Sequence, residues 1–435
     1  MTLENLKQAF LDHGCEKVYV KSLAANDLSK SQVYLGGNYD ILNIFPLSDI
    51  LPNADGKRKR ESFIATLNFA WITEEGTICY APHAKFILYP DYPEVRFSGF
   101  LKACKNAPSA IMNEKLTGRL LFLGVSRDGR TLGFASMPDS EIANEIRCLH
   151  LEEYGVFRVL ELKPIVDHRL LLLAELLRIH RLGWIDSKRL NKASEILPCP
   201  SPNCGGLTLE AELGIVPNSY SEPDYLGYEI KQFKVNNFDK IANEVITLMT
   251  PEPNGGLYVE KGIDPFIRLY GYPDKSGIVD RLNFGGVHKF GIRQPLTGLT
   301  LHLVGFDQAS SKIIKADGSI SLIDDSGNEA SKWSFITLLK HWTKKHNQAC
   351  YVPSKSIISP TKQYQYGNNI LIGNGTEFDL FLRQMAMGNV YYDPGVKMEQ
   401  ASSKPLIKRR SQFRIKSGNL KSLYKKSETI NLLTI

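Results

Sequence analysis

The sequence predicts an α/β protein in two parts: a mostly β N-terminal domain over residues 1–155, then a mixed α/β domain over residues 156–425. Three observations support this division. Short segments rich in β-branched and aromatic residues fill the first third of the chain. A long amphipathic segment then begins near Asp167. Helical and strand patterns mix from there to about residue 350, and residues 426–435 are expected to form a C-terminal tail.

The N-terminal domain is expected to begin with a helix over residues 2–13, because Leu3, Leu6 and Phe10 recur at helical spacing. Predicted strands follow, separated by turn-forming residues such as Gly76. These strands cover residues 17–20, 63–73, 85–89, 119–125 and 132–135.

The second domain is expected to open with a helix over residues 167–182, which Gly183 ends. A connector rich in Pro and Gly covers residues 198–206. A second helix is predicted over residues 333–346, where Leu338 and Trp342 share one apolar side.

The net charge of +7 is concentrated at the C-terminal end of the chain. Residues 401–435 hold nine basic side chains and one acid, so the rest is almost neutral. This pattern excludes a uniformly basic coat protein and favours a local anionic partner such as phosphate. No apolar run approaches the roughly 18 residues of a membrane span. The first residues also lack the pattern of a secretory signal, so a cytoplasmic location is expected.

The seven cysteines have no spacing typical of a disulfide framework, so they are predicted to be reduced thiols. Cys199 and Cys204 are the only close pair that suggests a metal. A structural zinc site needs four ligands, and no second pair with suitable spacing follows. We therefore do not predict zinc.

The most informative segment is residues 205–234, in which Asp224 is followed by Glu229 and Lys231. A strand over residues 225–233 would project Glu229 and Lys231 from the same face. A turn at residues 221–224 would place Asp224 at the start of that strand, with its carboxylate near Glu229. Glu210 is a candidate additional acid from a preceding element.

Two carboxylates and an ammonium group at one place suit cleavage of a phosphodiester. Asp224 and Glu229 would hold Mg²⁺, a hard cation that prefers oxygen ligands. Lys231 would orient the attacking water and offset developing charge. The spacing alone also fits a solvated strand face. A looser copy of the pattern, Asp139 with Glu161 and Lys163, fits the polar face of an ordinary strand better.

The sequence around these residues resembles the MvaI/BcnI family of type II restriction endonucleases, relatives of the mismatch-repair nickase MutH in the PD-(D/E)xK superfamily. The similarity lies in GGLTLEAELGI and PDYLGYEIK, in ITLMTPEPNGG, and in KRRSQFRIKSGNLKSLY near the C-terminus. It covers roughly residues 160–425, with gaps.

The resemblance implies a nuclease core with a mixed sheet flanked by helices. By position it implies catalytic roles for Asp224, Glu229 and Lys231, an auxiliary role for Glu210, and Mg²⁺ as cofactor. It also implies a monomer that cuts double-stranded DNA and a cognate DNA methyltransferase in the same system. The N-terminal domain does not match the family, which leaves open a DNA-recognition or a regulatory role for it.

Candidate DNA-binding residues lie mainly in the basic C-terminal segment. Arginine can read guanine, glutamine can read adenine and lysine can neutralise phosphate. A solvated, disordered tail is the alternative interpretation. Asp393 could accept from cytosine or lie in an ordinary turn, and His288 could contact DNA or be structural. The candidates are Lys408, Arg409, Arg410, Gln412, Arg414, Asp393 and His288.

The sequence therefore predicts a Mg²⁺-dependent, sequence-specific DNA endonuclease. Two alternatives remain open: a strand-nicking repair nuclease similar to MutH, and a DNA-binding protein that does not cleave. A membrane-binding role for the tail is not expected.

Overall fold

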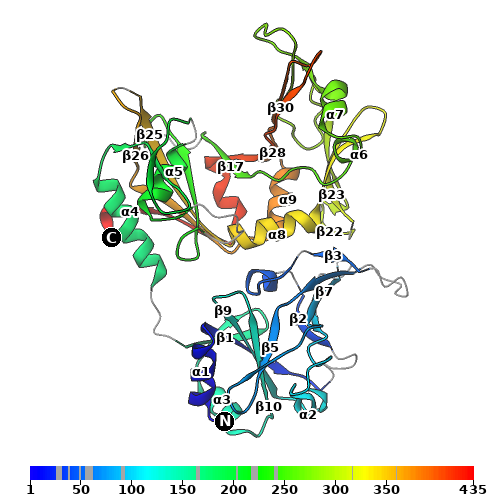
Figure 1. Cartoon of the computed structure of the whole chain (residues 1–435), viewed down its shortest axis with the longest axis vertical. Helices are drawn as coiled ribbons and strands as arrows, with labels where there is room; N and C mark the ends of the chain where they lie inside the picture. Colours follow the sequence, from blue (N-terminus) through cyan, green and yellow to red (C-terminus); the bar gives the residue numbers. More distant parts are fainter. Residues whose placement is uncertain are drawn as a thin grey trace. The chain divides into compact units, whose positions relative to one another are not determined.

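The structure is a computed structural model of the chain, and it describes residues 1–25, 32–37, 40–48, 50–53, 62–89, 94–162, 167–201, 204–216, 224–239, 243–315, 317–358 and 360–435. The chain divides into two compact units, Met1–Val166 and Asp167–Ile435 (Figure 1). This division falls later than the expected residue 155. The reason is that β12 (Phe157–Glu161) pairs with β1 (Cys15–Leu23) inside the first unit. In the described ranges, no helix is long and apolar enough to cross a membrane.

The first unit is built mostly from strands, as predicted. A seven-stranded sheet has the order β11-β12-β1-β9-β10-β5-β6, and a five-stranded sheet has the order β2-β8-β7-β4-β3. The remaining strands of the larger sheet are β5 (Phe69–Ile72), β6 (Ile78–Tyr80), β9 (Arg119–Ser126), β10 (Thr131–Ser136) and β11 (Glu152–Tyr154). The smaller sheet contains β2 (Gln32–Gly36), β3 (Leu51–Pro52), β4 (Phe63–Thr66), β7 (Lys85–Tyr89) and β8 (Glu94–Ser98). The helical segments are α1 (Leu3–Asp12), α2 (Ser109–Asn113), α3 (Glu141–Cys148) and the 3-10 helix η1 (Asp40–Asn43).

The helix predicted at the N-terminus is confirmed as α1. Its apolar side chains Leu6 and Phe10 are buried in one cluster with Val18 and Phe122 of the larger sheet. The Phe10 ring packs so closely that a Cβ at position 124 would lie 2.7 Å from it, which explains the glycine in β9. The strand predicted over residues 63–73 is instead two strands, β4 and β5, which belong to different sheets.

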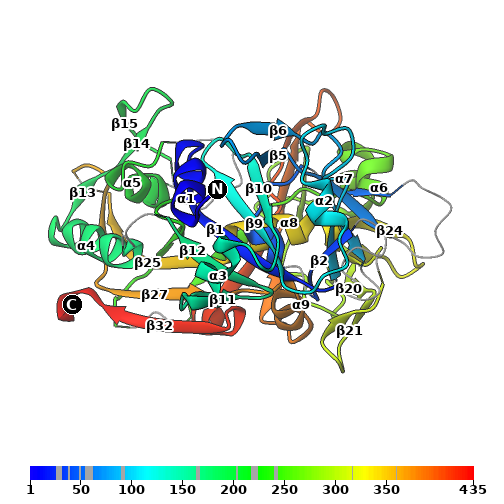
Figure 2. The ribbon, with the colours of Figure 1, turned by 90° about the horizontal axis from the view of Figure 1, so that it is seen from below.

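The second unit contains a sheet with the order β13-β26-β25-β27-β32, and β16 joins it by pairing in parallel with β25. Figure 2 shows β25, β27 and β32 side by side. The strands are β13 (Ile185–Asp186), β16 (Glu229–Lys234), β25 (Gln348–Ile357), β26 (Gln363–Tyr366), β27 (Asn369–Asn374) and β32 (Lys426–Asn431). Residues 426–435 are therefore an edge strand and the 3-10 helix η3 (Leu432–Thr434), not the separate tail that we expected.

Two helices, α4 (His168–Arg181) and α5 (Cys204–Glu212), pack on this sheet. Leu176 of α4 and Leu209 of α5 share a buried cluster with Ile230 and Val352 of the strands. The predicted helix over residues 167–182 is thus α4, and the side chain of Asp167 caps it by accepting from the Leu170 amide at 2.9 Å. Because the Ile230 side chain packs in this cluster, the side chains of Glu229 and Lys231, its neighbours in β16, project from the opposite face of the strand.

The rest of the second unit consists of small sheets and short helices. The strands are β14 (Lys188–Leu190), β15 (Ile196–Pro198), β17 (Val245–Met249), β18 (Tyr272–Pro273), β19 (Arg281–Gly285), β20 (Thr300–Val304), β21 (Phe306–Asp307), β22 (Lys312–Ile313), β23 (Ser319–Ile323), β24 (Glu329–Ser334), β28 (Val390–Tyr392), β29 (Gly395–Glu399), β30 (Leu406–Lys408) and β31 (Phe413–Lys416). The helical segments are α6 (Leu257–Glu260), α7 (Ile263–Tyr270), α8 (Phe335–His346), α9 (Phe378–Ala386) and the 3-10 helix η2 (Ser417–Leu423). The helix predicted over residues 333–346 is α8, although Trp333 itself still belongs to β24.

The cysteines differ from the prediction at one pair. Cys199 and Cys204 form a disulfide, so the expectation of seven reduced thiols is wrong for these two residues. Both side chains are buried where β15 leads into α5, and this proximity makes the bond possible. The other five cysteines are free thiols.

Candidate active site

The candidate catalytic segment contains a tight turn, whereas the turn expected at residues 221–224 lies mostly outside the described residues. Tyr225 and Tyr228 exchange two backbone hydrogen bonds, of 3.0 and 2.8 Å. Between them Leu226 and Gly227 both have positive φ, 50° and 85°, as a type I′ turn requires. This reversal brings Asp224 beside the following strand, where its Oδ2 accepts from the Ile230 amide at 3.0 Å.

Glu229 and Lys231 lie on one face of β16, as the alternation of a strand predicts. The Lys231 Nζ donates to Glu229 Oε1 at 2.6 Å. The Glu229 side chain is 2 % exposed, whereas that of Lys231 is 23 % exposed and can reach a ligand. The second oxygen of Glu229, Oε2, is buried and accepts no hydrogen bond from a described residue.

Two residues of α8 complete the surroundings of Glu229, and the sequence analysis did not assign them to the site. Lys345 Nζ lies 3.9 Å from Glu229 Oε1. His346 is buried, stacks on Trp342 with ring centroids 4.2 Å apart, and lies 3.1 Å from the Leu248 carbonyl through Nε2. The only signal in the sequence was a basic, His-containing end on an otherwise apolar helix.

The electrostatics of the site show crowded carboxylates held by cations. Burial, followed by repulsion from Glu229, raises the pKa of Asp224 to about 7. Burial also raises the pKa of Glu210 on α5, against the attraction of Lys231. Burial would raise the pKa of Glu229 as well, but the charge of Lys231 and smaller effects of His346 and Lys345 hold it below its usual value.

These residues fit a magnesium ion that keeps much of its own hydration. Glu229 offers a buried oxygen that has no hydrogen-bond partner among the described residues, and the charge of Asp224 is repelled by that of Glu229. A cation between the two carboxylates would supply a partner for the buried Glu229 oxygen and offset the repulsion between Glu229 and Asp224. In the described parts of the chain, no three His, Cys, Asp or Glu side chains form a ready-made metal cluster. Mg²⁺ is usually held by only one or two carboxylates, with water and substrate phosphate as its other ligands.

The basic C-terminal segment is folded, contrary to the alternative of a disordered tail. Its β31 lies between β17 and β28, and Phe413 and Ile415 are fully buried. Lys408, Arg409 and Arg410 are exposed, and Lys408 pairs with Glu399 at 3.6 Å.

Three predicted DNA-contacting residues occupy different environments from those we expected. Gln412 is buried, which does not agree with direct reading of a base. Arg414 and Asp393 form an ion pair with each other, and Arg414 also donates to the Thr247 hydroxyl at 3.3 Å. This pair braces β28 against β31, and each side chain is still 22 % exposed.

The expectation that His288 contacts DNA is contradicted by its burial. Its side chain is 0 % exposed. Its Nδ1 lies 2.9 Å from the Gly286 carbonyl and its Nε2 lies 2.9 Å from the Thr297 hydroxyl. Burial also lowers the pKa of His288 to about 4, so the ring is neutral and structural.

The second, looser copy of the motif does not form a site among the described residues. Glu161 lies on β12 and pairs with Lys17 across the sheet at 3.6 Å. Lys163 lies outside the described residues.

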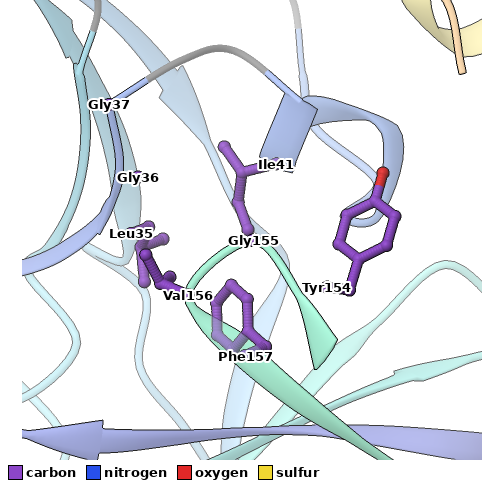
Figure 3. Close-up of a pocket in the computed structure, with 8 residues that line it drawn as sticks. All are labelled: Leu35, Gly36, Gly37, Ile41, Tyr154, Gly155, Val156 and Phe157. Atoms are coloured by element: carbon purple, nitrogen blue, oxygen red, sulfur yellow. The ribbon is translucent and has the colours of Figure 1, made fainter. Parts of the chain in front are cut away.

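The first unit has a pocket of about 300 Å³, lined by Leu35, Gly36, Gly37, Ile41 and residues 154–157 (Figure 3). Its walls are aliphatic side chains, the rings of Tyr154 and Phe157, and glycine backbone. No charged side chain lines it, so it has none of the groups that the candidate catalytic chemistry requires.

Comparison with known proteins identifies the class to which this arrangement belongs. The sequence profile of the MvaI/BcnI restriction endonuclease family matches residues 173–424, more than half of the chain. The chain therefore belongs to the MvaI/BcnI restriction endonuclease family, whose members are DNA-cleaving enzymes.

Among solved structures, the chain is similar to the restriction endonuclease MvaI in complex with its cognate DNA substrate. That match has 17 % identity and a TM-score of 0.46, and it covers 61 % of this chain and 99 % of the other. MvaI in the absence of DNA matches with 18 % identity and a TM-score of 0.34, covering 62 % and 99 %. No curated protein matches the chain.

Proposed function

We propose that this protein is a Mg²⁺-dependent endonuclease of type II restriction class that hydrolyses double-stranded DNA at a short specific sequence. The observation that carries the proposal is the meeting of Asp224, Glu229 and Lys231 within the part of the chain that matches the family. We also propose that it acts in the cytoplasm beside a cognate DNA methyltransferase. The first unit would serve as a DNA-recognition or regulatory module.

In the proposed mechanism, Asp224 and Glu229 would hold Mg²⁺ through the carboxylate oxygens described above. Bound there, the ion would polarise a phosphoryl oxygen and acidify water. Lys231 is partly exposed, so its ammonium group can turn from Glu229 towards the substrate and orient the attacking water. The water oxygen bonds to phosphorus in line as the bond to the 3′ oxygen breaks. The water releases a proton to solvent, and the departing 3′ oxygen takes one up from solvent to become a hydroxyl. Lys231 offsets the charge that develops on the phosphoryl oxygens.

The supporting residues have separate tasks in this proposal. Glu210 is attracted by the charge of Lys231 and would help to hold the ammonium group at the site. His346 is neutral at physiological pH, because burial lowers its pKa to about 4, so it supports Glu229 without titrating. Lys408, Arg409 and Arg410 would bind the phosphates of the duplex.

Cleavage of a fully sequenced plasmid with Mg²⁺, followed by sequencing of the fragment ends, tests the proposal. We expect fragments with one common end sequence. Because the described residues contain one such carboxylate and lysine cluster, a monomer would cut the two strands in succession and produce a transient nicked circle. Nicked circles that persist would instead support a nickase similar to MutH. Tight binding without cleavage in either Mg²⁺ or Mn²⁺ would support a non-cleaving DNA-binding protein.

A further inference from the structure

The second unit carries a braced apolar tip that the catalytic proposal does not use. The tip consists of residues 274–280, between β18 and β19, and residues 400–405, between β29 and β30. At its end Val279 is 89 % exposed and Ile278 is 48 % exposed. These two adjacent aliphatic side chains form a small exposed apolar surface at the end of the turn.

Hydrogen bonds to its polar residues join the parts of the tip. Asp274 accepts from the Ser276 amide and from Asn283 Nδ2, both at 2.8 Å. Asp280 accepts from the Ser402 amide at 2.8 Å and from its hydroxyl at 2.7 Å, which joins the two turns.

Backbone conformation confirms that the tip is a built feature. Asp280 and Gln400, one in each turn, both have left-handed φ, 59° and 55°. A non-glycine residue costs free energy in this region, so two of them at one place require the surrounding bonds to impose the shape. These bonds and dihedral angles set the backbone course on both sides of Ile278 and Val279.

The charges around Ile278 and Val279 indicate the kind of partner. Lys275 lies in the same turn and Lys404 in the joined turn, and both are exposed. Neither lysine forms an ion pair with a described residue. The acids of the tip, Asp274 and Asp280, are instead used in its internal bonds. The surface is therefore apolar at the end and cationic beside it.

We propose that this tip inserts Ile278 and Val279 into the minor groove of the bound duplex, while Lys275 and Lys404 contact the flanking phosphates. Apolar wedges from rigid elements partly unstack base steps and bend the duplex, and phosphate contacts compensate the cost. The inference rests on the proposed DNA-cleaving function and adds a distortion step to it. It predicts that the enzyme reads the deformability of its site as well as its base edges.

The test measures binding by the full-length protein to two short duplexes in Ca²⁺. One duplex carries the cleavage site found by end sequencing, and the other has unrelated sequence. We expect the double variant Ile278→Ser, Val279→Ser to bind the site about tenfold more weakly, or about 1.4 kcal/mol. The slope of log K against log salt should stay unchanged. Lys275→Gln and Lys404→Gln should each lower that slope by about one.

Distortion of the duplex is measured separately, with 2-aminopurine placed at successive positions of the site. Wild-type protein should raise the fluorescence at one base step, and the double serine variant should not. Ile358→Ser is the matched control, because Ile358 is 80 % exposed in the same unit and outside the tip. This control should behave as wild type in both measurements.

Two results would overturn the proposal while leaving DNA cleavage intact. One is wild-type affinity and fluorescence in the double variant. The other is a change in its sedimentation without a change in DNA binding, which would make the tip a contact between copies of the chain. If the wild-type protein binds DNA without cutting it, cleavage is wrong, and the tip is tested on a duplex with a site selected by binding. If it binds no DNA, both proposals fail.

Discussion

Replacing Asp224 with Asn should stabilise the metal-free protein and inactivate it. The pKa of Asp224 rises from 3.8 to about 7 on folding, so the folded state resists its charge. Without solvent screening, this pKa shift corresponds to a change of roughly 4 kcal/mol in the free energy of unfolding. Because Asp224 remains partly exposed, solvent screening reduces the expected gain to about 1–2 kcal/mol. For a unit of this size, that gain is a rise in Tm of about 3–6 °C. Asn keeps an oxygen for the Ile230 amide, so the turn should persist.

The stability gained by Asp224→Asn should depend on pH. A folded pKa above the unfolded one favours folding at low pH, and this contribution is lost as pH rises through the folded value. The advantage of Asp224→Asn should therefore be absent below pH 3.8, grow up to about pH 7 and stay constant above it. Thermal unfolding of the second unit in EDTA, at pH 5 and pH 8, measures this growth.

The controls for this prediction distinguish the effect of the buried Asp224 charge from the effect of replacing any carboxylate. Asp239→Asn, at an exposed carboxylate, should change Tm little at either pH. Addition of Mg²⁺ should raise the Tm of wild type and leave Asp224→Asn unchanged. If Asp224→Asn lowered Tm at pH 8 in EDTA, or cleaved plasmid DNA at the wild-type rate, the reasoning about this carboxylate would be wrong.

The other predictions concern the cations. Lys231→Ala should reduce the cleavage rate at least about a thousandfold, as loss of an electrostatic stabiliser does. Its affinity for the duplex in Ca²⁺ should stay within a few-fold of that of wild type. Comparable losses of rate and affinity would instead assign Lys231 to binding. Lys345→Gln should reduce the cleavage rate by about tenfold and shift the pH dependence of that rate to higher pH. The reason is that it removes a charge that lowers the pKa of Glu229 and Glu210. An unchanged pH dependence in a rate series from pH 5.5 to 9 would contradict this. The double variant Arg409→Gln, Arg410→Gln should lower the salt slope of DNA binding by about two, and an unchanged slope would remove both from the interface.

The parts of the site that could be predicted from the sequence are those set by local rules. Glu229 and Lys231 share a face because side chains alternate along a strand, and this needs no knowledge of the fold. The approach of Asp224 to this strand was also predictable. The expected turn at residues 221–224 lies mostly outside the described residues, and a further turn lies at Leu226 and Gly227. Helices α1 and α4 followed from apolar periodicity, since each buries a single stripe.

The burial of His288 and Gln412 could not be predicted, because their polar side chains look the same in sequence whether exposed or enclosed. His288 is neutral in the core only because Gly286 and Thr297 supply partners for both ring nitrogens. Similarly, Arg414 meets Asp393 through the pairing of β28 with β31, a contact made by two segments whose register the sequence does not reveal.

The contribution of α8 shows why a catalytic motif is only part of a catalytic site. Glu229 is 2 % exposed, and a carboxylate so buried keeps its charge only if cations surround it. Lys231 is one such cation and belongs to the motif. Lys345 is a second cation, 3.9 Å from Glu229 Oε1. It comes from a distant segment, α8, which reaches Glu229 because β25, the strand that follows α8, pairs in parallel with β16. In this chain, the additional positive charge beside Glu229 comes from α8, the element that precedes the neighbouring strand β25. The Lys345→Gln measurement therefore tests whether the charge that α8 brings to Glu229 contributes to catalysis.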